Sequence, residues 1–111
     1  VGGLTVLREI IKLLPGEDII YIGDTANVPY GDKKAKDIYN LSERLIDFLL
    51  SAKVKTIVVA CHTVSVALRR FFSSPEGEVK ILDIIHPTVD FLLKRHYSII
   101  GLIGSKATVD S

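Results

Sequence analysis

The sequence has no methionine, no tryptophan and only one cysteine among its 111 residues. A single cysteine excludes an intramolecular disulfide framework and a cysteine-rich zinc site, and it suits a reducing compartment such as the cytoplasm. The three histidines are scattered and do not form a metal-binding pattern. We therefore expect neither a disulfide scaffold nor a metal centre.

A strong excess of one charge is missing too, since 14 Lys and Arg face 13 Asp and Glu for a net charge of +1. No basic patch stands out, so we expect no nucleic-acid partner. No apolar run reaches the roughly 18 residues that a membrane span needs, and no basic-then-apolar signal segment opens the chain. Hydrophobic residues make up 48% of the sequence, which excludes a disordered tail. These features indicate a globular cytoplasmic protein without a membrane partner.

Both ends of the sequence are unusual for a complete protein. The chain begins Val1-Gly2-Gly3 without a methionine, and it stops at Asp110-Ser111 where a helix is starting. We expect it to be part of a longer protein, truncated at both ends, with an incomplete active site.

Helical and strand-like segments alternate along the chain. The predicted helices are 4–14, 35–52, 61–72, 86–96 and one that begins near 104; the predicted strands are 18–23, 56–60, 79–85 and 98–103; Pro/Gly loops are predicted at 25–34 and 73–78. This order predicts a single α/β domain over residues 1–111, with a doubly wound parallel sheet flanked by helices as in flavodoxin-like and Rossmann-like folds. Because such a domain normally begins with a strand, we expect that the first strand is missing from this chain.

Ligands of such sheets bind beyond the carboxyl ends of the strands, and Cys61 follows a predicted strand directly. At the first turn of a helix, backbone N–H groups and the helix dipole stabilise a thiolate, which can act as a nucleophile or a base. Thr63 and Ser65 place hydroxyl donors beside it that suit a carboxylate. The alternative is an inert thiol that packs as a small hydrophobe.

Other polar positions near strand ends have two readings each. His62 is either a ligand contact or a solvent-facing helix residue, and Asp24 is either a helix cap or a ligand contact. Tyr30 and Gly31 lie in a turn that would present a phenol and an open amide to a substrate, although such a turn needs no ligand. His86 and the third histidine read as ordinary residues near helix ends.

Four motifs occur in order along the chain: VGGLTV at 1–6, GDTANVPYG at 23–31, VVACHT at 58–63 and IGSKATV at 103–109. Together they resemble the bacterial glutamate racemase family, across essentially all of this chain and about the first half of a family member. The resemblance implies the N-terminal domain of an enzyme with two similar α/β domains. It also implies cofactor-independent interconversion of L- and D-glutamate, which supplies D-glutamate for peptidoglycan, and a homodimeric assembly.

The family mechanism places two cysteines on opposite faces of the substrate, because inversion needs one group to remove the α-proton and another to return a proton. By the resemblance, Cys61 is the catalytic cysteine of the first domain. Tyr30 and Gly31 match the substrate-binding turn, and Thr63 matches a residue that helps to hold a substrate carboxylate. The second cysteine is absent from this chain.

Two positions depart from the family pattern. His62 stands where the family has a substrate-contacting Asn, so we expect it to bind substrate with altered specificity, because imidazole is bulkier and can carry charge. His86 stands where a Glu usually precedes the helix proline. Ser105 and Thr108 resemble the hydroxyl pair near the end of this domain.

Three functions follow from these observations. The first is glutamate racemisation, in which this fragment alone is inactive because it supplies one face of the site. The second is racemisation of aspartate or another dicarboxylate amino acid, through the change at His62. The third is a non-catalytic, racemase-like binding module.

Overall fold

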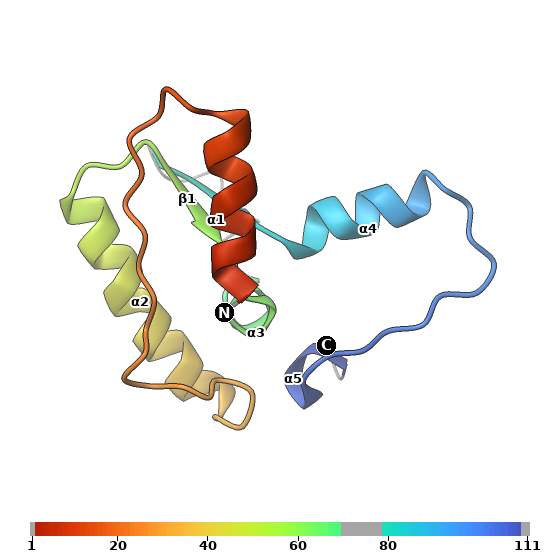
Figure 1. Ribbon diagram of the computed structural model, residues 1–111. Helices are drawn as coiled ribbons and strands as arrows, with labels where there is room; N and C mark the ends of the chain where they lie inside the picture. The colour runs from red at the N-terminus through yellow and green to blue at the C-terminus, as the bar shows by residue number, and fades with distance from the viewer. Residues whose placement is uncertain (1, 70–78, 110–111) are drawn as a thin grey trace.

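The computed structural model describes residues 2–69 and 79–109 (Figure 1). In these ranges the chain forms the helices α1 (Gly2–Leu13), α2 (Ala35–Ser51), α3 (His62–Ala67), α4 (Ile85–Leu93) and α5 (Lys106–Val109), and the strands β1 (Thr56–Val59) and β2 (Lys80–Asp83). The predicted loop at 73–78 and the end of the helix predicted at 61–72 lie outside the described residues.

The two strands pair in parallel, with Thr56 opposite Lys80 and Val59 opposite Asp83. Parallel neighbours cannot be joined by a tight hairpin, and the connection between them runs through α3. Helices that alternate with parallel strands make this an α/β, Rossmann-like fold, as the sequence predicts.

The core lies between β1, α2 and α3. Side chains alternate along a strand, so Ile57 and Val59 point to the same face, where they meet the fully buried Leu68. The helical period of α2 turns Ile46 and Leu49 toward this cluster. The packing of α3 on β1, α2 and α5 makes this short helix the centre of the described structure.

The sheet is smaller than the sequence predicts. The segments 18–23 and 98–103 form no strand, and in the described ranges only β1 and β2 pair with each other. A strand needs a neighbour for its backbone groups, and Figure 1 shows α4 leading away from the sheet before the chain curves back to α5. The apolar side chains of 98–103 consequently face solvent, with Ile103 fully exposed.

The face of the sheet opposite the core is partly exposed among the described residues. Val58 and Leu82, which alternate with the core side chains, are about 40% and 39% exposed. Helix α1 has no buried residue, and one of its contacts is the Tyr21 phenol, whose oxygen would lie 3.0 Å from a Cβ at Gly3. The total accessible surface is 8779 Å², whereas a compact protein of this mass exposes about 6,100 Å².

A groove of about 310 Å³ runs along the end of α4 and the chain that follows it. It is lined by Val89, Leu92, Leu93, His96, Tyr97 and Ile100. The candidate site residues do not line this groove. Among the described residues, no helix combines the length and apolar character that crossing a membrane requires.

Candidate functional site

Cys61 lies two residues after the end of β1, at the N-cap of α3. Its backbone is extended (φ −121°, ψ 119°), and its carbonyl accepts the first hydrogen bond of the helix from Ser65 N at 2.8 Å. Its side chain is exposed. The thiol therefore does not pack as a small hydrophobe, and it is open to a ligand.

A chain of hydroxyl groups joins α3 to α5. Thr63 is buried, and its Oγ1 lies 3.3 Å from Oγ of Ser105, which in turn lies 3.1 Å from Oγ1 of Thr108. The structure thus brings Ser105 and Thr108, which lie near the end of the sequence, together with Thr63, which follows Cys61 by two residues. Hydroxyls donate and accept hydrogen bonds, so this row can hold a carboxylate.

The turn that contains Tyr30 and Gly31 reaches the same hydroxyls. A Cβ at Gly31 would lie 3.2 Å from Cβ of Ser105, which is closer than ordinary contacts allow. Lys33 N donates to the carbonyl of Tyr30 at 3.2 Å, and the peptide bond before Pro29 is cis. Glycine at position 31 therefore permits a close approach of two backbone segments that are far apart in the sequence.

The Tyr30 phenol points to Asp24, and its hydroxyl donates to Oδ2 of that carboxylate at 2.5 Å. Burial, this hydrogen bond and the charges of Asp24 and the Cys61 thiolate together raise the pKa of Tyr30 well above its usual range. The same hydrogen bond, with further ones from Asn27, lowers the pKa of Asp24 despite some desolvation. Tyr30 consequently stays neutral, and Asp24 stays ionised.

Asp24 caps no helix of the described residues, which is one of the two roles that its position predicts; its carboxylate instead accepts hydrogen bonds from Asn27 and Tyr30 of its own loop. A sequence signal for its local role exists, because an Asp in a loop often accepts hydrogen bonds from the backbone N–H groups just after it. No comparable sequence pattern predicts the hydrogen bond between Asp24 and Tyr30. His62 is the first residue of α3 and is exposed.

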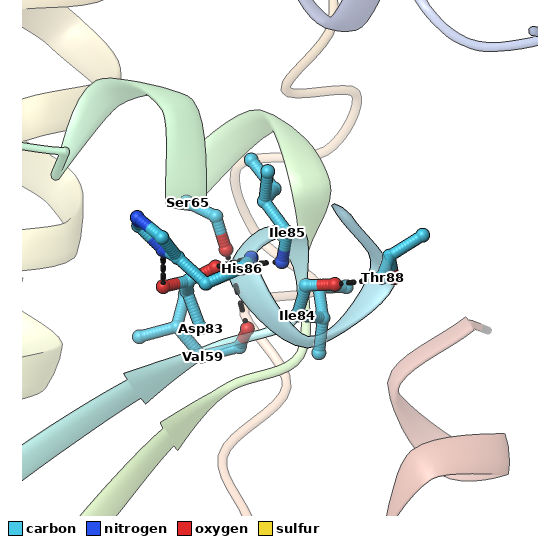
Figure 2. A network of polar contacts seen from close by, with 7 residues as sticks. All are labelled: Val59, Ser65, Asp83, Ile84, Ile85, His86 and Thr88. Carbon is cyan, nitrogen blue, oxygen red and sulfur yellow. Dashed lines mark hydrogen bonds and ion pairs between the residues drawn. The ribbon is translucent and has the colours of Figure 1, made fainter. Parts of the chain in front are cut away.

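His86 belongs to a second polar network, at the carboxyl ends of the two strands (Figure 2). The buried Asp83 carboxylate accepts hydrogen bonds from Ile85 N at 2.6 Å and His86 N at 2.8 Å, and Oδ2 accepts one from His86 Nδ1 at 2.5 Å. Burial acts to raise the pKa of Asp83, but these hydrogen bonds and the charge of His86 outweigh it and lower the pKa. Asp83 thereby ties the start of α4 to the end of β2.

Asp83 is a residue of this network that the sequence motifs do not single out. The signal available was an Asp at a strand end, two residues before the first turn of a helix, where a carboxylate can accept the free N–H groups. In α3, the hydroxyl of the buried Ser65 donates to the carbonyl of Val59, at the end of the neighbouring strand β1, at 3.3 Å (Figure 2). Among the described residues, no group of three or more His, Cys, Asp and Glu is arranged to hold a metal ion.

Comparison with known proteins places this site in context. The chain is 40% identical over 112 aligned residues to glutamate racemase from Neisseria gonorrhoeae, and equally so to glutamate racemase from Streptococcus gordonii. Each alignment covers the whole chain and 42% of the relative. The chain thus spans about two fifths of the length of these relatives. No family model matches the sequence.

Solved structures of glutamate racemases from other organisms share the fold of this chain. The chain superimposes on glutamate racemase from Thermus thermophilus, solved with β-chloro-D-alanine, with a TM-score of 0.88 and 40% identity over 99% of this chain and 42% of that one. For glutamate racemase from Francisella tularensis, solved with D-glutamate, the TM-score is 0.86 at 32% identity, covering 99% and 41% of the two chains. The resemblance to glutamate racemases is therefore confirmed in sequence and in structure along the whole chain.

Proposed function

We propose that this chain is the N-terminal α/β domain of a two-domain, cofactor-independent glutamate racemase and supplies one face of its active site. The observation that carries the proposal is the exposed Cys61 thiol at the end of β1, beside a turn and a row of hydroxyls drawn from three separate parts of the chain. The similarity to glutamate racemases over the whole chain supports the choice of substrate.

The chemistry requires one acid–base group on each face of the α-carbon. In the proposed mechanism the Cys61 thiolate removes the α-proton and becomes a thiol, and the electron pair of the broken C–H bond stays on the α-carbon. An opposing thiol, from a second cysteine outside this chain, then protonates the other face. Exchange of protons with solvent then returns Cys61 to the thiolate and the opposing cysteine to the thiol, so protons and charges balance without a cofactor.

The substrate is held by hydrogen-bond donors in this proposal. The hydroxyls of Thr63, Ser105 and Thr108 form a row that suits a carboxylate, and the turn at Tyr30 and Gly31 offers its backbone. His62 contacts the substrate where the family has Asn. The product D-glutamate serves peptidoglycan synthesis, and the enzyme is a cytoplasmic homodimer.

Exchange of the α-proton tests this function directly. The full-length protein that contains this chain, incubated with L-glutamate in D₂O, should incorporate deuterium at the α-carbon and form D-glutamate. Cys61→Ala should slow both by about 10²- to 10⁴-fold, the usual contribution of a general acid–base group. Ser51→Ala, a change of similar size at the exposed end of α2, should leave the rate unchanged. A full-length protein that exchanges no α-proton, or a Cys61→Ala variant at parental rate, would refute the proposal.

A second candidate is racemisation of aspartate or another dicarboxylate amino acid. The observation that favours it is the exposed imidazole of His62 next to Cys61, in place of the family carboxamide. Exchange of the α-proton of aspartate faster than that of glutamate would select this candidate. Binding of either amino acid without exchange would instead identify a non-catalytic module.

A further inference from the structure

In the loop between residues 24 and 31, the Asp24 carboxylate is hydrogen-bonded to other residues of the same loop. Asp24 Oδ1 accepts the backbone N–H of Asn27 at 3.2 Å, and the Asn27 amide Nδ2 lies 2.9 Å from each carboxylate oxygen. Tyr30 Oη donates to Oδ2 at 2.5 Å. These donors occupy the carboxylate from within the loop, so its role is internal to the loop.

The hydrogen bond to Asp24 also decides what Tyr30 can offer. A phenol has one proton to donate, and that proton is directed to Asp24. Tyr30 therefore does not donate its hydroxyl to a substrate carboxylate while this bond holds. What the turn presents to the hydroxyl row is its backbone at Gly31, where an added Cβ would lie 3.2 Å from Cβ of Ser105.

We propose that Asp24 is a positioning residue of the candidate site, which holds the Tyr30 phenol by its hydroxyl and so sets the place of Gly31 against Ser105. The inference rests on the proposed function for its consequence in catalysis, but the contact itself is independent of it. Small displacements of groups that position a substrate are costly for rate, so the loss of this anchor should weaken substrate binding.

Electrostatics agree with this arrangement. The negative charge of Asp24, and that of Cys61 when it is ionised, raise the pKa of Tyr30. The neutral phenol is the form that donates to Asp24, so these charges favour the anchored state.

The contact can be measured without any activity. Absorbance near 295 nm follows tyrosine ionisation, and subtracting the titration of Tyr30→Phe from that of the full-length parent isolates Tyr30. Asp24→Asn should move the Tyr30 titration to lower pH, because the charge repulsion is lost; burial, the largest cause of the raised pKa, remains, so the titration should stay above the usual value of about 10. Asp32→Asn removes the same charge from an exposed site in the same loop and should leave the titration in place. An unchanged titration in Asp24→Asn, or an equal shift in both variants, would overturn the proposal.

The positioning role is tested by a double-mutant cycle on glutamate turnover. Asp24→Asn should raise KM about tenfold with a smaller change in kcat, and it should add less than about twofold when Tyr30 is already Phe, because the two act as a unit. Additive effects of the two substitutions would show that Asp24 does not act through Tyr30. A shifted titration in a parent protein that exchanges no α-proton would refute the proposed function and the positioning role, while the Asp24–Tyr30 contact would stand.

A variant that fails to fold does not remove the test. If Asp24→Asn is unstable, the contact is measured from the other side in Tyr30→Phe, through the carboxyl ¹³C resonance of Asp24. The Tyr30 hydroxyl is the largest cause of the lowered pKa of Asp24, so the carboxyl should titrate at higher pH in Tyr30→Phe than in the parent. An unchanged carboxyl titration would contradict the proposal.

Discussion

The hydroxyl oxygens of Thr63 and Ser105 lie 3.3 Å apart although the two residues are separated by 42 positions in the sequence. One follows β1 in α3, and the other directly precedes α5. This contact brings a late segment of the chain to Cys61, and the turn at Gly31 closes on the same serine. The candidate site therefore forms where three segments of the chain come together, and its geometry depends on the spacing between them.

That spacing should be sensitive to one methyl group at Gly31. In the full-length protein, Gly31→Ala would press a Cβ against Ser105 at 3.2 Å, so the turn or the serine must move. We expect KM for glutamate to rise several-fold, as judged from initial rates of racemisation. Gly16→Ala, where no atom lies within 4 Å of the new Cβ, should leave KM unchanged. The added substitution Ser105→Gly should partly restore the spacing, and a KM that is normal in Gly31→Ala would show that the close approach is unimportant.

The hydrogen bonds of Asp83 should make the free energy of unfolding depend on pH. The pKa of Asp83 is lower in the folded than in the unfolded chain, so its contribution is present above about pH 4 and is lost as the pH falls through the folded pKa. Asp83→Asn should lower the free energy of unfolding by about 1–2 kcal/mol at pH 7, the usual contribution of a carboxylate at a helix start. The deficit relative to the parent should shrink below pH 4.

Urea unfolding of the full-length protein at a series of pH values measures this effect. Asp90→Asn, the same substitution at an exposed position of α4, serves as the control and should change stability by less than about 0.5 kcal/mol at each pH. A deficit for Asp83→Asn that is constant from pH 7 to pH 3 would contradict the assignment.

The core should tolerate little loss of volume at Leu68, the most deeply buried hydrophobic side chain, at 1% exposure. Leu68→Ala should cost about 2–5 kcal/mol through lost burial and the cavity left behind. Leu102→Ala removes the same atoms from an exposed side chain and should change stability by less than about 0.5 kcal/mol. Thermal or urea unfolding of the two variants compares them, and equal costs would mean that Leu68 is not the centre of the core.

The imidazole of His62 should influence which dicarboxylate is used. We expect His62→Asn to change the ratio of kcat/KM for glutamate to that for aspartate by about tenfold, since the smaller carboxamide alters the shape and charge next to Cys61. His96→Asn is the matched control, because it lies beyond α4 at a positive φ of 51°, a conformation that Asn also adopts. An unchanged ratio would make the substitution at position 62 incidental to specificity.

Several features of the fold and the site could be predicted because their causes are local. The 3.6-residue period of apolar side chains predicts α2 within one residue of its observed bounds, and the apolar run at 56–60 predicts β1. The position of Cys61 between a strand and a helix follows from the same patterns. The bond between Asp24 and Tyr30 was not predicted, because the sequence does not specify that partner. Asp83 was missed although its partners follow it directly in the chain.

The order of helices and strands, the parallel connection between β1 and β2 and the place of Cys61 between strand and helix are determined by the sequence itself, through side-chain periodicity and chain order. Tertiary structure alone decided that 18–23 and 98–103 have no strand partner among the described residues, and that Asp24 takes the Tyr30 hydroxyl. The reason is physical: a helix satisfies its backbone from within, whereas a sheet ladder needs a neighbouring strand and a side-chain hydrogen bond needs a partner that the folded chain brings within reach.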